Sequence, residues 1–585
     1  MGARVSSRPA LAATATATAI AAAALPSLLA YNVSPSPTFL NQALAFALWG
    51  AFVLAAAPAS ALRAVGPVLA ALGLMAVAAA VSWGPGALPA SLGLSSIATL
   101  AAAAVLLAAG AGSRSRTGAE QLFAAFCWAW VAAGVLNIAV GAVQVFTPGM
   151  PDGEWIAHSS YPGRAVGNLR QPNHLSSLLL WHCIAVVALF ELKRLGRVAA
   201  ALLGALGVLA VVLTASRTGL VSVLLLALWG LADRKLSRPA RALLIAAPLV
   251  YLVSWLGMAE WAKLTQAAFG GSERLAESDI SSSRFGIWRD TLVLIRQQPW
   301  AGVGWGEFNF AWSLTPSPTR PTALFDHTHN LPLQLVVELG LPLSLAIMAP
   351  LVWGLARGAR RAWAAPAALG RVQRSAMVMV LMIGLHSLLE YPLWYSYFLL
   401  PAAWAWGCAL QGEPEPESER GPAAETKPAP SSTPLSVAAL AVVAVAALSV
   451  LDYTRVAAIF SASPGAPPLE QRIATGQHSI FFAHHADYAA VTSSAPGDDT
   501  PNAFRRATHY LLDARLMIAW AQDLASHGQV DLARHLAARL REFRKPDADE
   551  FFAPCPKEAV PAAPGLPFQC ELPQQPHDWR EFLSR

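Results

Sequence analysis

Stretches of about 20 mostly apolar residues recur along this chain from Pro9 to Leu410. A helix of that length is long enough to cross the hydrocarbon core of a bilayer. Hydrophobic residues make up 55% of the 585 positions and charged residues only 13%, against roughly 25% charged residues in ordinary soluble domains. Apolar side chains and Trp dominate these stretches, unlike the weak alternation of a membrane β-barrel. The sequence therefore predicts an all-α polytopic membrane protein.

We expect about 12–13 transmembrane helices in total. Arg4 and Arg8 precede the first span and place the N-terminus in the cytoplasm. A cleaved signal peptide is the alternative, but the apolar stretch exceeds a typical signal-peptide core, which favours an uncleaved anchor. With that start, the basic loops between spans fall on the cytoplasmic side. The predicted spans are residues 10–30, 41–60, 65–83, 93–112, 119–146, 174–192, 198–214, 219–232, 242–259, 331–356, 375–395, 396–410 and 435–451.

Two long segments, 147–173 and 260–330, then face the outer side, which is the periplasm if the membrane is a bacterial inner membrane. The net charge of +6 is modest, and no basic patch with interleaved aromatics indicates a nucleic-acid partner. The predicted organisation is N-terminal transmembrane helices with the first periplasmic loop (1–173), a membrane core that includes loop 260–330 (174–410), a disordered cytoplasmic linker (411–434), one further span (435–451) and a periplasmic C-terminal domain (452–585).

The C-terminal domain has a helical pattern. Apolar periodicity over residues 510–543, with a break at His527-Gly528, predicts a helical hairpin. Cys555 and Cys570 are candidates for a disulfide in an oxidising compartment. The other cysteines lie in predicted spans and are expected to pack as small apolar residues: Cys127, Cys183 and Cys408.

The polar pentapeptide Asp326-His327-Thr328-His329-Asn330 lies where the second outer segment meets an apolar run. Two imidazoles and a carboxylate at a membrane surface are suited to proton transfer. The structural alternative is a boundary histidine that hydrogen-bonds a neighbouring helix. A second polar stretch, residues 167–174, directly precedes another span. An interfacial turn capped by Asn173 would explain part of it, but a pocket for a polar ligand better explains the crowding of Arg170, Gln171 and His174.

Two further arginines stand in unusual surroundings. Arg217, in Ala215-Ser216-Arg217-Thr218-Gly219, interrupts an apolar run. A tight outer turn eased by Gly219 is the alternative, but an arginine beside lipid needs an anionic partner, and phosphate matches its planar guanidinium. Arg284 lies in Ser281 to Asp290, where serines precede an amphipathic helical pattern that ends at Pro299. A helix N-terminus beside an arginine suits an anion; a solvated amphipathic helix is the alternative.

In this order the motifs resemble those of the O-antigen ligase and polymerase superfamily, and more closely those of bacterial protein O-oligosaccharyltransferases. The ligase-type motif is His329-Asn330 followed by Gly340, with Leu343 in place of the small residue or Tyr of the ligases. The other segments that carry the resemblance are Pro26-Ser27 with Pro35 to Phe39, Gly167 to His174, Ser281 to Asp290, Pro299 to Gly306, Glu390 to Tyr395 and Phe481 to Ala483.

The resemblance implies en bloc transfer of an oligosaccharide from a polyprenyl diphosphate to a Ser or Thr hydroxyl of a periplasmic or pilin-like protein. The charge of the leaving diphosphate needs stabilisation, for which Arg217 and Arg284 are the best candidates and Arg170 a third. The acceptor hydroxyl needs a general base. His329 is the predicted base, with the following alternatives: His327 and His174.

Further residues join the predicted site. By resemblance, Gln171 and Tyr391 bind the sugar or shape the acceptor pocket, and Asn173 and Asn330 support it. The carboxylates that are candidates to orient His329 are Asp326, Glu338 and Glu390. No His, Cys and carboxylate spacing indicates a metal site, and no cofactor is expected. Two alternatives remain for the function: a lipid A-core or growing glycan as the acceptor, or a transporter, although no internal repeat favours the latter.

Overall fold

The protein is described by a computed structural model over residues 7–59, 61–112, 116–276, 283–322, 324–412, 432–493, 500–561 and 565–583. Within these ranges the chain forms helices, turns and loops, apart from two isolated bridges. Of the described helices, nine are long and apolar enough to cross a membrane. The predicted all-α polytopic membrane fold is confirmed.

A helix occupies each predicted span. Part of α1 and the whole of α8 are apolar but shorter than a full span. These helices are α1 (Ser7–Leu28), α2 (Phe39–Ala56), α3 (Leu62–Trp83), α4 (Ala90–Ala111), α5 (Arg116–Phe146), α6 (Pro172–Glu191), α7 (Arg197–Thr214), α8 (Arg217–Ala232), α9 (Arg238–Thr265), α13 (Leu331–Ala364), α14 (Ala367–Ser387), α15 (Ser396–Ala409) and α16 (Thr433–Phe460).

Shorter helices form the outer segments. The predicted hairpin is confirmed as α20 and α21, joined at Gly528 with a φ of 76°, and Cys555 and Cys570 form a disulfide. The short helices are α10 (Gly270–Ala276), α11 (Arg284–Gln297), α12 (Phe308–Leu314), η1 (Pro392–Trp394), α17 (Leu469–Gln477), α18 (Ala483–Thr492), α19 (Thr500–Ala507), α20 (Ala514–Ser526), α21 (Val530–Phe543), η4 (Pro546–Ala548), α22 (Asp549–Phe552), η5 (Phe568–Cys570) and η6 (Trp579–Phe582).

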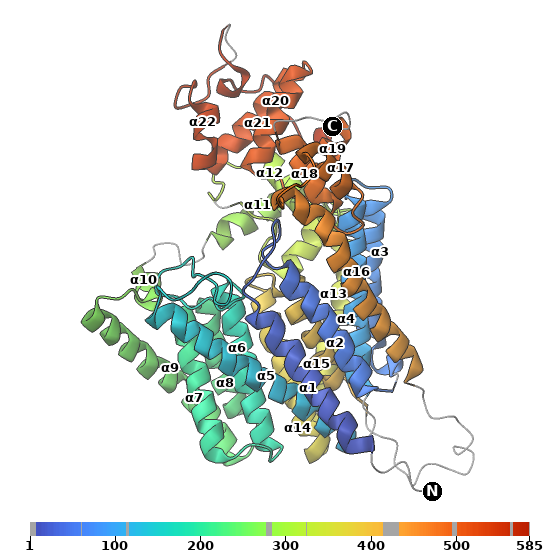
Figure 1. Ribbon diagram of the computed structural model, residues 1–585, viewed down its shortest axis with the longest axis vertical. Helices are drawn as coiled ribbons and strands as arrows, with labels where there is room; N and C mark the ends of the chain where they lie inside the picture. Colours follow the sequence, from blue (N-terminus) through green and yellow to red (C-terminus); the bar gives the residue numbers. More distant parts are fainter. Residues whose placement is uncertain are drawn as a thin grey trace. The chain divides into compact units, whose positions relative to one another are not determined.

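The chain forms two compact units, each assembled from separate stretches of sequence. The first unit comprises Met1–Ala70, Ala101–Ser278 and Pro350–Leu448. In it, α6 to α9 lie side by side (Figure 1). Glycines allow its helices to approach closely: a Cβ on Gly110 would lie 2.0 Å from the Trp404 carbonyl oxygen. Such small residues at helix contacts are typical of membrane bundles.

The second unit comprises Ala71–Leu100, Asp279–Ala349 and Ser449–Arg585. Its core joins the C-terminal helices to α11 and α12. Arg320 is buried between the rings of Trp312 and Phe543, 4.7 and 4.8 Å from their centroids. Its Nε also donates to Glu542 Oε2 over 2.9 Å. A buried guanidinium needs such compensation, so this contact fixes the segment after α12 against α21.

Candidate active site

The start of α6 organises the polar residues of the first unit. Gln171, not Asn173, is the N-cap, and its side chain accepts hydrogen bonds from the backbone N–H groups of Asn173 and His174. Pro172 occupies the first helical position, where its missing N–H is harmless. The expectation that Asn173 caps the helix is therefore wrong. The cap is Gln171, two residues earlier, because its longer side chain reaches the free backbone N–H groups.

Asn173 instead joins three segments. Its Nδ2 donates to Glu390 Oε1 over 3.1 Å, and its Oδ1 accepts from Ser216 Oγ over 2.7 Å. Ser216 is the N-cap of α8 and accepts from the backbone N–H of Gly219 over 3.0 Å. Sequence reasoning overlooked Ser216, although serine before a helix start is an ordinary cap signal. The amide thus holds the starts of α6 and α8 to the segment that follows α14.

Arg217 is the first residue of α8, and its guanidinium donates to the Arg274 carbonyl over 2.9 Å. The turn before it depends on Ala215, whose φ is 49°. The sequence suggested that Gly219 eases this bend, but the structure shows otherwise. Gly219 lies inside α8, where a Cβ would come 2.4 Å from Ser176 Oγ, so its role is to allow close packing of α8 on α6.

Arg170 and His174 are held by different surroundings. Arg170 has a φ of 57°, and its guanidinium donates to the Ala30 carbonyl. Partial burial lowers the pKa of Arg170, which makes a further anionic partner favourable. The His174 ring is buried, with Nδ1 3.1 Å from the Tyr397 hydroxyl and its centroid 4.6 Å from that of Tyr395. Tyr391 stacks on the same Tyr395 at 6.1 Å.

In the second unit, α11 is bonded to the histidine loop, which we define as residues 325–330. Trp288 Nε1 donates to the Thr328 carbonyl over 2.9 Å. Arg284 begins α11 one turn earlier and therefore lies on the same side of the helix as Trp288. Ser283 directly precedes α11, as the sequence predicted, with a φ of 66° and no side-chain cap bond; Ser281 and Ser282 lie outside the described residues.

The buried stripe of α11 is not its apolar stripe, on which the helical period places Phe285, Trp288, Leu292 and Ile295. Phe285 is 69% exposed and Leu292 46% exposed. The buried residues are Ile287, Asp290, Thr291 and Leu294. Asp290 is accommodated because it accepts from Trp312 Nε1 and from Ser317 Oγ. This leaves an aromatic and aliphatic face of α11 uncovered.

The histidine loop fixes the orientation of His329. Its φ is 57°, and Nδ1 lies 3.0 Å from the His327 carbonyl oxygen. A carbonyl only accepts, so Nδ1 carries the proton and Nε2 carries the lone pair. Asn330 then starts α13 by accepting from the Leu333 N–H over 3.0 Å. This tautomer is the one that a base acting through Nε2 requires.

His327 is paired with a carboxylate. Its Nδ1 lies 2.9 Å from Asp326 Oδ1. Burial disfavours the charged ring, but the charge and hydrogen bond of Asp326 outweigh it and raise the pKa of His327. A ring that holds its proton more tightly is a poorer base at neutral pH. This favours His329 over His327 as the base.

A break in α13 follows the histidine loop. Gly340 has a φ of 71° inside the helix, and the carbonyls released there accept bonds from another segment: Val303 N–H donates to Val337 and Gly304 N–H to Glu338, each over 2.9 Å. A Cβ on Gly340 would lie 2.2 Å from the Trp300 carbonyl oxygen. The stretch from Pro299 to Gly306 thus satisfies the backbone of the broken helix.

The predicted site residues therefore form two groups. In the first unit, contacts join Gln171, Asn173, His174 and Glu390 with Ser216 and the tyrosines beyond α14. Arg170, Arg217 and Tyr391 belong to the same unit. In the second unit, contacts join His327, His329 and Asn330 with α11, whose first residue is Arg284.

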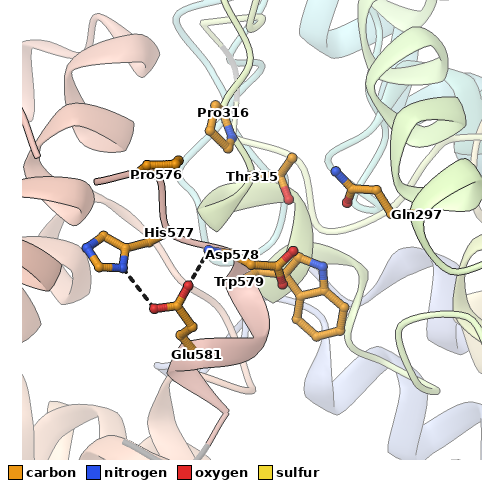
Figure 2. Close-up of a pocket in the computed structure, with 8 residues that line it drawn as sticks. All are labelled: Gln297, Thr315, Pro316, Pro576, His577, Asp578, Trp579 and Glu581. Atoms are coloured by element: carbon orange, nitrogen blue, oxygen red, sulfur yellow. Dashed lines mark hydrogen bonds and ion pairs between the residues drawn. The ribbon is translucent and has the colours of Figure 1, made fainter. Parts of the chain in front are cut away.

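A small pocket of about 240 Å³ in the second unit is lined by the end of α11, the segment after α12 and residues 576–581 (Figure 2). Its charged groups are paired with one another: His577 bonds Glu581 and Asp531 over 2.8 and 2.9 Å, and Asp578 bonds Arg580. Burial opposes protonation, but these carboxylates raise the pKa of His577. The pairing favours a structural role in attaching the chain end to α21. The pocket is lined by Gln297, Thr315, Pro316, Pro576, His577, Asp578, Trp579 and Glu581.

Comparison with protein families gives three matches, and each one falls on a predicted motif. A model described as "O-Antigen ligase" matches residues 200–348, which include Arg217, Arg284 and His329. One described as "Protein glycosylation ligase" matches residues 165–190, which include Gln171. Over these residues the chain is similar to the O-antigen ligase family and to protein glycosylation ligases. A third model, "Virulence factor membrane-bound polymerase, C-terminal", matches residues 375–551.

Two curated relatives come from Acinetobacter baylyi. The chain is 27% identical over 318 residues to a "General O-oligosaccharyltransferase". This alignment covers 52% of this chain and 53% of the relative. It is 29% identical over 260 residues to a "ComP-specific O-oligosaccharyltransferase", which covers 43% of this chain and 44% of that protein. The chain thus spans about half the length of the curated relatives it matches.

Proposed function

We propose that this protein is an O-oligosaccharyltransferase of a bacterial inner membrane. It moves an oligosaccharide en bloc from a polyprenyl diphosphate to Ser or Thr hydroxyls of periplasmic or pilin-like proteins, and its site faces the periplasm. The observation that carries the proposal is the distance of 3.0 Å between His329 Nδ1 and the His327 carbonyl oxygen. Because a carbonyl only accepts, we assign the proton to Nδ1 and the lone pair that takes the acceptor proton to Nε2. The names of both curated relatives support the reaction class.

In this mechanism the acceptor oxygen attacks the anomeric carbon as its proton passes to His329 Nε2. The glycosyl–phosphate bond breaks, and the diphosphate leaves with the electron pair. Arg217 and Arg284 stabilise the negative charge on the departing group, with Arg170 as a third cation. Gln171, Asn173, Glu390 and Tyr391 bind the sugar or shape the acceptor pocket. Direct attack inverts the anomeric centre and needs no metal.

The test uses the full-length protein with a lipid-linked oligosaccharide and a candidate pilin, in cells that lack their own transferase. We expect glycan on the pilin with the wild-type protein and none with His329→Ala, although that variant still accumulates in the membrane. His327→Ala should retain part of the activity. Full activity in His329→Ala, or complete loss only in His327→Ala, would show that the base is assigned to the wrong residue.

A second candidate function keeps the chemistry and changes the acceptor to lipid A-core sugar or a growing glycan. The match to the "O-Antigen ligase" model over residues 200–348 favours it. The same cells distinguish the two: glycan that appears on lipopolysaccharide and never on protein would contradict protein glycosylation and support this alternative.

A further inference from the structure

Within the second unit, Asn309 links the histidine loop to a segment almost two hundred positions later in the chain, because it is bonded both to Phe325 and to Leu512. We propose that residues 509–512 brace the histidine loop, and that Asn309 is the positioning residue through which they act. The inference rests on the proposed function of His329 as the base, and it gives the C-terminal part of the chain a role in that site.

Asn309 uses both ends of its amide. It lies in α12 and is only 4% exposed. Its Oδ1 accepts from the backbone N–H of Leu512 over 2.7 Å, and its Nδ2 donates to the carbonyl of Phe325 over 2.9 Å. The N–H of Leu512 therefore requires an acceptor, and the carbonyl of Phe325 requires a donor. An amide meets both demands, whereas a carboxylate would present an oxygen to the Phe325 carbonyl.

The segment 509–512 is itself firmly held. His509 Nδ1 lies 2.6 Å from Glu307 Oε2, and both side chains are buried. The His509 ring stacks on Phe310 with centroids 4.2 Å apart. Glu307, Asn309 and Phe310 lie at the start of α12, so one short helix receives three contacts from the C-terminal segment.

From Asn309 the contact reaches the base in two steps. The Phe325 carbonyl is bonded to Asn309, and the Phe325 ring meets the His329 ring edge-on at 5.2 Å and 90°. The loop needs such external support because His329 has a left-handed backbone, which the surrounding structure must maintain. Tyr510 supports the same arrangement: burial and the negative charge of Asp326 raise the pKa of Tyr510, as expected if its hydroxyl lies near the loop.

The test compares Asn309→Asp with a matched loss of one buried hydrogen bond in the same unit. Ser317→Ala serves as the control, because Ser317 Oγ donates to Asp290 Oδ1 over 2.9 Å and contacts neither Asn309 nor the loop. Two measurements are made on the full-length protein in detergent: amide hydrogen exchange over residues 325–330, and kcat and KM for glycan transfer. Asn309→Asp keeps the acceptor for Leu512, loses the donor to Phe325 and places a carboxylate oxygen against the Phe325 carbonyl.

We expect faster exchange confined to the histidine loop and a fall in kcat of roughly tenfold or more, since small displacements of a base are costly. KM should change less than about twofold, and Ser317→Ala should match the wild type in both measurements. The proposal would be overturned if Asn309→Asp showed the same amide exchange and the same kcat as the wild type. It would also be overturned if exchange rose equally throughout the second unit. If the wild-type protein transfers no glycan, the proposed function fails, and loop exchange alone still decides whether the brace exists.

Discussion

Backbone strain marks the predicted site at the scale of single residues. Eight non-glycine residues in the described ranges have a positive φ. Several of them, such as Ala215, end helices, where a left-handed residue is ordinary. Arg170, Ser283 and His329 do not end a helix, and each lies in one of the four polar motifs identified from the sequence. Such conformations persist where function requires a particular direction of a side chain.

The role of Arg284 is tested by a change that keeps its charge. Arg284→Lys should lower kcat/KM for the lipid-linked donor roughly tenfold, about 1.4 kcal/mol, because an ammonium lacks the paired donors that fit a diphosphate. Arg296→Lys is the control, since Arg296 lies on the same helix and is exposed. Donor kinetics with purified protein provide the measurement. Equal donor kinetics for the two variants would contradict a role of Arg284 in binding the diphosphate.

At the scale of elements, the broken helix α13 is the most informative. Its first part begins at Leu331 and is capped by Asn330, directly after His329, and the break at Gly340 lets the backbone of Val303 and Gly304 pair with it. Gln334 reinforces this part, because its Nε2 donates to Glu338 and its Oε1 accepts from the Thr328 N–H. The start of α13 and the histidine loop are thus one bonded structure.

Gly340→Ala should therefore be costly. The new Cβ would lie 2.2 Å from the Trp300 carbonyl oxygen, at a φ of 71°. We expect a loss of roughly 1–3 kcal/mol in stability, measured as a lower thermal midpoint in detergent. Gly384→Ala in α14 is the control: nothing lies within 4 Å of its Cβ, so it should be neutral or stabilising by up to about 1 kcal/mol. Equal midpoints for both variants would contradict a backbone requirement at Gly340.

At the scale of the whole molecule, the second unit contains several buried histidines. Burial lowers the pKa of His485 to about 4. Burial is also the main cause that lowers the pKa of His535 to about 4. Their ordinary value is 6.5, so the unfolded chain takes up protons first as the pH falls. Both residues therefore stabilise the fold above pH 6.5, and this contribution is lost progressively from pH 6.5 down to about 4.

Acidification should consequently lower the thermal midpoint of the second unit. A pKa that moves from 6.5 to about 4 corresponds to roughly 3 kcal/mol per group at the acid end. His485→Phe keeps an aromatic ring beside Tyr510 and removes the titration, so its midpoint should fall less between pH 6.5 and 4. His527→Phe is the control, because His527 is 62% exposed. Identical pH profiles for His485→Phe and the wild type would contradict this cause.

The sequence by itself determined the membrane helices, the hairpin of α20 and α21, and the four polar motifs. These follow from local rules: apolar length decides whether a helix spans, and Arg or His at a membrane boundary is costly enough to be informative. Helix caps were less predictable. Gln171 replaced Asn173 because the choice depends on side-chain reach, and Ser283 adopted a left-handed backbone that no composition rule signals.

Only the tertiary structure decided how distant residues combine. Asn173 with Ser216 and Glu390, and Asn309 with Leu512 and Phe325, are pairings across long stretches of chain. Their geometry depends on how helices pack, and many packings satisfy the same hydrophobic pattern. The sequence already predicted His329 rather than His327 as the base; only the structure showed that a carbonyl lies beside one ring and a carboxylate beside the other. A sequence shows which groups are available, whereas folding decides which hydrogen bonds they make.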